Sequence, residues 1–277
     1  LFRSQIARLR RILERTVETL QYQLQQGSFV PAAYEKGFGG RGGDTISFEL
    51  ADHGMLRLNG QIDRVDLCEE EGRRFVKIID YKSGSRSLDP EQMRKGLQIQ
   101  LLLYMNAVLQ EQQHLHPGDT VVPSAMLYYR LQDPVVEGTV SEQDFEEERT
   151  PEELEAAHQE EQKAIRKKLR PTGMVSGDPA SLQRLDHSRS GTSEAIPVRF
   201  KQDGSPDARS SVYSQQEFEE LSEEVRKVIC QIAEEILKGN VSAVPAKLPR
   251  NKTACEFCPY KNVCGFDPRI PGYDYRD

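Results

Sequence analysis

The chain lacks the sequence features that would place it in a membrane or direct it out of the cell. No window approaches the roughly 18 consecutive apolar residues that a membrane-spanning helix requires. The first residues, Leu1-Phe2-Arg3-Ser4, begin an amphipathic helix rather than a signal peptide. An initiator methionine is missing as well, so we expect a fragment of a longer polypeptide. These absences predict a soluble, cytoplasmic protein with no membrane partner.

An excess of positive charge is also missing. The 277 residues contain 44 acidic and 37 basic side chains, which gives a formal net charge of -7. The chain as a whole therefore does not attract nucleic acid, and any surface that binds phosphate must be a local basic patch. Hydrophobic residues make up 37%, which is low for a globular protein, but a chain of this length can still bury a substantial core.

Cysteines are too few and too unevenly placed for a disulfide framework. Three of the five crowd together as Cys255, Cys258 and Cys264. Thiolates at this spacing bind zinc or an iron-sulfur cluster. Zinc needs four ligands and no histidine lies near the three cysteines, so a four-cysteine cluster with one remote ligand is a strong alternative. We expect Cys68 and Cys230 to be packed or partly exposed thiols rather than the fourth ligand.

Apolar periodicity and turn-forming residues predict an α/β protein. The expected core elements are, in order, a helix at 2–24, strands at 45–50, 55–67 and 73–82, a helix at 89–110 and a strand at 125–131. A glycine-rich loop is expected at 31–43, a turn at 52–54 and a further candidate strand at 135–140. A strand reached through a helix crossover lies parallel to its neighbour, so the sheet is expected to be mixed.

The remainder of the chain predicts additions to this core. Capping boxes that begin at Thr150 and Ser214 open two further helices. We therefore divide the chain into a core at 1–136, an acidic insert of a helix and loops at 137–213, and a long helix with a cysteine-rich tail at 214–277. We expect this last segment to pack on the core.

The first helix is predicted to be amphipathic. Its apolar stripe consists of Phe2, Ile6, Leu9, Leu13, Val17, Leu20 and Leu24, and its outer face carries Arg3, Arg8, Arg10, Arg11 and Arg15. The arginines indicate an ordinary solvated face, with a patch that contacts phosphate as the weaker alternative.

Two acidic strands carry the strongest functional signal. The first contains a Gly-x-x-Asp-Arg-x-Asp run with Asp63, and the second ends in Asp80-Tyr81-Lys82. Because side chains alternate along a strand, Asp80 and Lys82 project from the same side. The same parity places Asp63 on one face with Val65, toward the covered side of a sheet. Acids that face a core need a partner, and a metal ion is a common one.

These residues predict a site for a divalent metal ion. Two neighbouring carboxylates repel each other, and a cation removes that conflict. Asp63, Asp80, the backbone carbonyl of Tyr81 and water form the incomplete oxygen shell that Mg²⁺ or Mn²⁺ favours. Lys82 would orient or deprotonate a metal-bound water, or stabilise the charge that develops on phosphorus. The alternative is an ordinary ion pair between Asp80 and Lys82, with Asp63 in a turn at a strand end.

A Gln-x-x-x-Tyr motif lies in the helix that follows. Gln100 and Tyr104 are separated by one helical turn and so share one face. From there they can hydrogen-bond the metal site or a nucleic-acid backbone, whereas Tyr104 packed alone would be a core aromatic. Glu35, in the glycine-rich loop, is a further acid that we leave outside the catalytic set.

Together these motifs resemble the RecB-like branch of the PD-(D/E)XK nucleases, and most closely its AddB-like members. The match covers 60–131, the long helix and the cysteine tail. It implies an αβββαβ core with a mixed central sheet, in which Asp63, Asp80 and Lys82 hold the metal and catalytic positions. Gln100 and Tyr104 match the Gln-x-x-x-Tyr motif of this family.

The resemblance also implies cofactors and partners. In AddB-like proteins the cysteine triplet joins one cysteine upstream of the nuclease core to bind a 4Fe-4S cluster. No cysteine precedes Leu50 here, so we expect the fourth ligand, and a histidine of the family's first motif, outside this chain. The implied activity is that of an exonuclease that cuts single DNA strands with Mg²⁺ or Mn²⁺. It works beside an AddA-like helicase-nuclease partner in double-strand break repair by recombination.

Two other functions are compatible with parts of the sequence. One is a non-catalytic DNA-binding or scaffold module in which the iron-sulfur cluster is the working part. The other is a freestanding Cas4-like exonuclease, against which the long 137–213 insert and the absent fourth cysteine argue. The nuclease domain of a helicase-nuclease complex is the function that uses all of the motifs.

Overall fold

The computed structural model describes residues 2–39, 46–51, 54–84, 87–136, 150–249 and 251–276. Their spatial grouping divides the chain into two compact units. The larger comprises Leu1–Ile46, Asn59–Leu88 and Gln100–Glu219, and the smaller comprises Ser47–Leu58, Asp89–Ile99 and Glu220–Asp277. All predicted catalytic residues belong to the larger unit, and the cysteine triplet belongs to the smaller. The division into core, insert and C-terminal segment stays a prediction.

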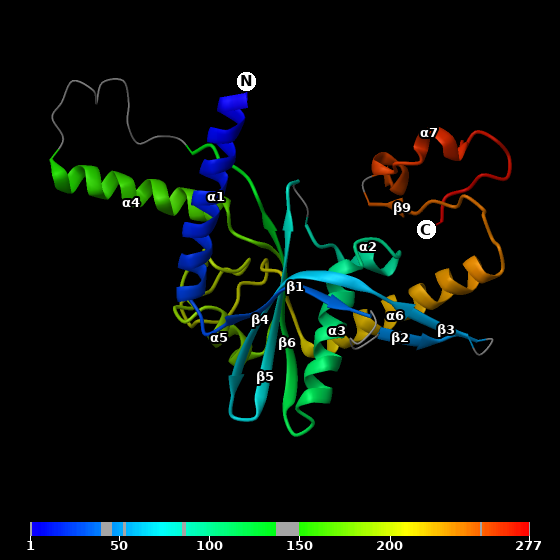
Figure 1. The fold of residues 1–277 in the computed structure, drawn as a ribbon, viewed down its shortest axis with the longest axis horizontal. Helices are drawn as coiled ribbons and strands as arrows, with labels where there is room; N and C mark the ends of the chain where they lie inside the picture. Colours follow the sequence, from blue (N-terminus) through cyan, green and yellow to red (C-terminus); the bar gives the residue numbers. More distant parts are fainter. Residues whose placement is uncertain are drawn as a thin grey trace. The chain divides into compact units, whose positions relative to one another are not determined.

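A six-stranded sheet forms the centre of the larger unit (Figure 1). In spatial order its strands are β1 (Val30–Phe38), β4 (Gly60–Glu70), β5 (Arg73–Lys82), β6 (Thr120–Arg130), β7 (Thr172–Ser176) and β8 (Val212–Tyr213). β1, β4 and β5 form an antiparallel meander, and β6 lies parallel to β5. The predicted mixed sheet is confirmed. Of the candidate strand at 135–140, residues 137–140 lie outside the described part, and 135–136 form no strand.

Helices cover both faces of this sheet (Figure 1). α1 (Phe2–Gln25) lies on one side, and α3 (Gln100–Leu115), which links β5 to β6, packs on these two strands from the other. The sequence order α1, β1, β4, β5, α3, β6 is the predicted αβββαβ arrangement. α4 (Pro151–Lys168) and α5 (Pro179–Leu185) precede and follow β7.

The predicted loop at 31–43 is wrong where it overlaps β1. That segment pairs with β4 along its length, from Val30 opposite Leu67 to Phe38 opposite Gly60. β1 is an edge strand, and an edge tolerates the proline and glycine that favoured a loop in the sequence. Long-range backbone hydrogen bonds therefore decide the structure here.

The predicted strand at 45–50 is consequently not part of the meander. It forms β2 (Ile46–Glu49), which pairs with β3 (Met55–Leu58) in a separate two-stranded sheet. The predicted strand at 55–67 is interrupted at Asn59, where β3 ends and β4 begins. The predicted turn includes Asp52 and His53, which lie outside the described residues.

The predicted helix at 89–110 is two helices. α2 (Pro90–Arg94) starts as predicted after Asp89, whose side chain accepts a hydrogen bond from the backbone N–H of Glu91. The chain then leaves the helix through Gly96, at a φ of 74°, which glycine adopts readily because it has no Cβ. α3 begins after this break.

Both capping boxes are confirmed. Thr150 and Glu153 exchange hydrogen bonds at the start of α4, where the side chain of each bonds to the backbone N–H of the other. Ser214 and Glu217 make the same exchange at the start of α6 (Gln215–Leu237). Each box satisfies backbone donors that the first helical turn leaves without an intrahelical partner.

α1 packs through only part of the face that its apolar pattern predicts: Leu20 packs against the core, and Leu20 and Leu24 line a small cavity. Four stripe residues are 50% to 62% exposed, namely Ile6, Leu9, Leu13 and Val17. Thr16 and Thr19 are buried instead. Arg11 and Arg15, predicted to lie on the solvated face, both bind the carboxylate of Asp133 in the segment after β6. These ion pairs link the helix to the segment that follows β6.

The smaller unit contains the β2–β3 pair, α2, most of α6 and the C-terminal tail. In the tail, β9 (Lys247–Leu248) pairs with β10 (Lys252–Thr253). A short 3-10 helix (Ala254–Phe257) and α7 (Lys261–Cys264) follow and carry the cysteines. Within the described ranges, no helix is long and apolar enough to cross a membrane.

Candidate active site

The two predicted metal ligands lie on neighbouring strands. β4 and β5 pair antiparallel with Arg64 opposite Ile79, and continuing this pairing by one residue places Asp63 opposite Asp80. Directly opposed residues of antiparallel strands point to the same face of the sheet. Asp80 is 1% exposed, and Asp63 is half-buried. The structure therefore brings both carboxylates together on the face that α3 covers.

A backbone hydrogen bond orients the more exposed carboxylate. Oδ2 of Asp63 accepts from the backbone N–H of Tyr81 at 2.8 Å. Tyr81 lies between Asp80 and Lys82, so the carboxylate of Asp63 reaches across to the end of β5. An ionised carboxylate has two acceptor oxygens, and this bond leaves Oδ1 of Asp63 available in geometry for a further ligand.

The ammonium group of Lys82 is fixed by two neighbours. Its Nζ lies 2.5 Å from Oδ2 of Asp80 and 3.4 Å from Oε1 of Gln100. It also lies 5.7 Å from the ring centroid of Tyr128 on β6. An ordinary surface ion pair does not bury its carboxylate as deeply as Asp80 is buried, because that removes a charge from water. Asp80 and Lys82 thus form the same-face ion pair of the structural alternative, with a carboxylate that is almost fully buried, so the metal-binding role of Asp80 stays a prediction.

The Gln-x-x-x-Tyr motif supports Lys82 from α3. Nε2 of Gln100 donates to the hydroxyl of Tyr104 at 2.7 Å, so one side-chain amide joins the lysine to the tyrosine. Tyr104 is 8% exposed, and its ring meets that of Phe38 edge to face at 5.7 Å. Tyr104 is thus both a core aromatic and a hydrogen-bonding partner. The sequence analysis did not include Phe38 among the site residues. Recognising 30–38 as a strand would have shown which face Phe38 occupies.

The glycine of the first motif makes room for this packing. A Cβ added to Gly60 would lie 2.7 Å from the Phe38 ring and 3.3 Å from Tyr104. No side chain fits at that distance without moving the aromatic pair. The motif therefore joins β1, β4 and α3 as well as carrying a carboxylate.

The second half of the same motif lies on the opposite face. Arg64 and Asp66 are 3% and 0% exposed, and Arg64 donates to both oxygens of Asp66 at 2.6 and 2.8 Å. Nζ of Lys77 on β5 lies 2.9 Å from Asp66. Burial lowers the pKa of Lys77. Burial also acts to lower the pKa of Arg64, but the hydrogen bonds and the charge of Asp66 outweigh it, so the pKa of Arg64 lies above its ordinary value.

Glu35 lies near the site but is oriented differently from a ligand. It has a φ of 48°, which is uncommon for a residue with a side chain, and its carboxylate accepts from Nε2 of Gln61 at 2.6 Å. Its side chain is exposed at the sheet edge. We keep it outside the catalytic set.

The cysteine triplet is present as free thiols. Cys255 and Cys258 are half-buried and Cys264 is exposed. Cys68 is buried, which raises the pKa of its thiol, and Cys230 is half-buried on α6. Among the residues that the structure describes, no three His, Cys, Asp or Glu side chains are close enough together to hold one metal ion. The acidic site therefore offers two carboxylates, and the three cysteines do not converge.

The donors of the acidic site fit a hard divalent ion. Carboxylate oxygens and an incomplete shell completed by water suit Mg²⁺ or Mn²⁺, whereas zinc and iron-sulfur centres prefer nitrogen or sulfur. Asp63 and Asp80 are the residues that would hold such an ion.

Comparison with known proteins gives the family. A family model described as the PD-(D/E)XK nuclease superfamily matches residues 2–265, which is most of the chain. The chain belongs to this superfamily. Its members use divalent metal ions, in agreement with the donors at the acidic site. The predicted family resemblance is confirmed.

Curated relatives show which members of the superfamily this chain is similar to. An ATP-dependent helicase/deoxyribonuclease subunit from Clostridium botulinum (strain Hall) is 37% identical over 269 residues, which is 96% of this chain and 22% of the relative. The protein of the same name from Clostridium tetani is 39% identical over 270 residues, covering 97% and 22%. That from Caldanaerobacter subterraneus is 33% identical over 270 residues, with the same coverage. The chain thus spans about a fifth of the length of the relatives it matches.

Proposed function

We propose that this nuclease-family chain hydrolyses phosphodiester bonds in single DNA strands, with Asp63 and Asp80 as the ligands of Mg²⁺ or Mn²⁺. One observation carries the proposal: the deeply buried Asp80 lies between a second carboxylate and the ammonium group of Lys82. Membership of the superfamily supports the reaction class, and the name of the relatives, helicase/deoxyribonuclease, supports DNA as the substrate.

The residues of the chain would divide the chemistry among them. Asp63 and Asp80 would hold a divalent ion, which would supply a water of lowered pKa and offset charge on phosphorus. Lys82 has three N–H donors, of which two point to Asp80 and Gln100. The third is available to a phosphoryl oxygen, where a fixed positive charge stabilises the negative charge that develops during attack. The backbone N–H of Tyr81 holds Asp63 in position meanwhile.

The face of α3 would complete the site. Gln100 fixes Lys82 from one side and is fixed in turn by the hydroxyl of Tyr104. Because Tyr104 is held by the Phe38 ring, this chain of contacts needs little rearrangement when a substrate binds. Such preorganisation is what makes an electrostatic contribution to catalysis effective.

The decisive substitution is Asp80→Asn in the longer parent protein. It removes a metal ligand and releases Lys82, so we expect cleavage of one DNA strand to fall at least about 100-fold while DNA binding is retained. Asp119→Asn is the matched control, because Asp119 pairs with Arg74 at the other end of β5. Unchanged cleavage in Asp80→Asn, measured on end-labelled DNA, contradicts the proposal.

The relatives also indicate an assembly. Each is named as a subunit of a helicase/deoxyribonuclease, which implies a partner and, for this chain, a place within a larger complex. We extend this to an AddA-like helicase-nuclease partner that feeds single strands to the site during double-strand break repair. The cytoplasmic location stays a prediction.

The cysteine triplet is proposed to bind a 4Fe-4S cluster together with a fourth cysteine outside this chain. Three free thiols within a short stretch are suitable ligands, and thiolates favour such a cluster. The support is the chemistry of the ligands, because the three side chains are not grouped in this structure. The scaffold alternative has no separate observation in its favour.

A further inference from the structure

The Arg64-x-Asp66 half of the first motif has no part in the proposed chemistry, yet it is the most deeply buried ionic group in the sheet. Both oxygens of Asp66 are occupied by the fork of Arg64, and Oδ2 also meets Lys77. Asp66 and Lys77 are opposite each other in the β4–β5 pairing. The cluster therefore ties the two strands that carry the acidic site, from the face opposite the carboxylates.

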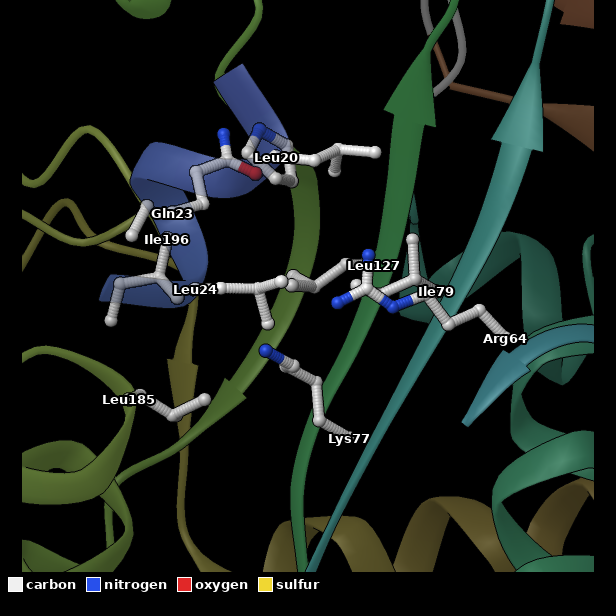
Figure 2. A pocket seen from close by; sticks show the side chains of 11 residues that line it. Leu20, Gln23, Leu24, Arg64, Lys77, Ile79, Leu127, Leu185 and Ile196 are labelled. Atoms are coloured by element: carbon white, nitrogen blue, oxygen red, sulfur yellow. The ribbon is translucent and has the colours of Figure 1, made fainter. Parts of the chain in front are cut away.

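Burial of these charges is a poor way to stabilise a sheet. Removing an ion pair from water costs as much free energy as the pair regains, and well-packed apolar residues in the same place are often as stable or more so. The surroundings are apolar enough for that: Figure 2 shows Arg64 and Lys77 beside a cavity lined by Leu20 and Leu24 of α1 and by Leu127. The cavity has about 20 Å³ of space, room for a water molecule at most. A role in positioning neighbouring groups thus explains the cluster better than a contribution to stability does.

A short path leads from this cluster through the sheet to the acidic site. Nη1 of Arg64 donates to the hydroxyl of Tyr81 at 3.4 Å, on the face opposite the carboxylates. The Tyr81 ring is also held edge to face by Tyr129, with centroids 5.8 Å apart. The backbone N–H of the same Tyr81 donates to the carboxylate of Asp63. Tyr81 therefore contacts Arg64 through its side chain and Asp63 through its backbone N–H.

We infer that Arg64, fixed by Asp66 and Lys77, is a positioning residue that holds Tyr81 and, through its backbone N–H, the metal-binding orientation of Asp63. The inference rests on the proposed function, because it assigns to Asp63 a metal ligand's role. Groups behind the ligands of a metal commonly change its affinity about 10- to 100-fold when they are altered. Arg64 acts on the affinity for the ion and not on the substrate.

Binding of Mn²⁺ alone to the full-length protein tests this, measured by electron paramagnetic resonance without DNA or nucleotide. The informative variant is Arg64→Lys, which keeps the charge but loses the fork that engages both oxygens of Asp66. We expect its Kd for the ion at the acidic site to rise about tenfold or more. Tyr81→Phe, which removes only a hydroxyl, is expected to shift the Kd in the same direction by a smaller factor. The amide of Tyr81 is expected to exchange hydrogen faster in both.

A matched control is Arg74→Lys. Arg74 is also on β5 and also binds two carboxylates, those of Glu69 and Asp119, but it lies at the far end of the strand. We expect it to leave the Kd for Mn²⁺ unchanged. Circular dichroism reports whether each variant folds. If Arg64→Lys does not fold, the Kd of Tyr81→Phe for Mn²⁺ tests the positioning role instead.

The outcomes separate the inference from the function it rests on. If Asp63→Asn and Asp80→Asn abolish Mn²⁺ binding while Arg64→Lys and Tyr81→Phe bind it as the wild type does, the positioning role is wrong and the nuclease proposal stands. If Asp80→Asn binds Mn²⁺ normally, the metal site itself is wrong, and the role of Arg64 is overturned with it.

Discussion

At Gly60 the backbone of β4 leaves no room for a side chain. The ring of Phe38, opposite it on β1, occupies the space that a Cβ would need, and Tyr104 lies close behind. A glycine there is therefore a packing requirement of the site, because Tyr104 in turn holds Gln100. The contact connects three elements that are distant in the sequence.

Gly60→Ala is expected to destabilise the protein by about 1–3 kcal/mol, because the added methyl group must displace the Phe38 ring. The free energy of unfolding, from urea denaturation followed by circular dichroism, measures this. Gly118→Ala is the control, since a Cβ at Gly118 meets nothing within 4 Å and is expected to change stability little. Equal stability of the two variants would show that the aromatic pair is more mobile than the structure indicates.

Among the elements, α1 departs most from its sequence pattern. Its apolar stripe is exposed over the first turns, while Thr16 and Thr19 are buried and Arg11 and Arg15 pair with Asp133. A helical period shows that one face differs from the other, but it does not say which face packs when arginines have a carboxylate to bind. β5 behaves as its pattern predicts, because both of its faces are covered.

The exposure of α1 gives a direct test. The double substitution Leu9→Glu and Leu13→Glu is expected to change the free energy of unfolding of this chain by about 0.5 kcal/mol or less, since both side chains are about 60% exposed and glutamate is also a good helix former. Leu101→Ala in α3 is the contrasting control, with an expected loss of about 2–5 kcal/mol because Leu101 is fully buried. A loss of several kcal/mol in the double variant would show that the stripe is packed after all.

At the scale of the whole molecule, the acidic site and the cysteine triplet belong to different compact units. The two proposed metal centres also use different chemistry, oxygen ligands in one and sulfur in the other. We therefore expect a chelator of Mg²⁺ to inhibit the proposed nuclease activity without removing iron from the proposed cluster.

Iron content of the full-length protein tests the second proposed metal centre. Purified without oxygen, it is expected to contain about four iron atoms per chain and to absorb broadly in the visible range. Cys258→Ser is expected to lose both signals, whereas Cys230→Ser, on α6, keeps them. Zinc in place of iron, or no metal at all in the wild type, would contradict the cluster proposal and favour a zinc or purely structural role for the cysteines.

How much the sequence determined depends on the range of the interaction. Alternation along β5 was sufficient to place Asp80 and Lys82 on one face, and the capping residues at Thr150 and Ser214 located two helix starts. These rules are local, because a strand period or a cap involves only a few neighbouring residues. The family motif, made of such short runs, was readable for the same reason.

Only the tertiary structure decided what depends on distant partners. β1 is a strand because β4 pairs with it, although its glycines and proline favour a loop. Arg11 and Arg15 of α1 pair with Asp133, more than a hundred residues away, and the contacts between Arg64 and Asp63 pass through Tyr81 on another strand. Contacts of this kind arise from close packing and burial, which no periodicity in the sequence encodes.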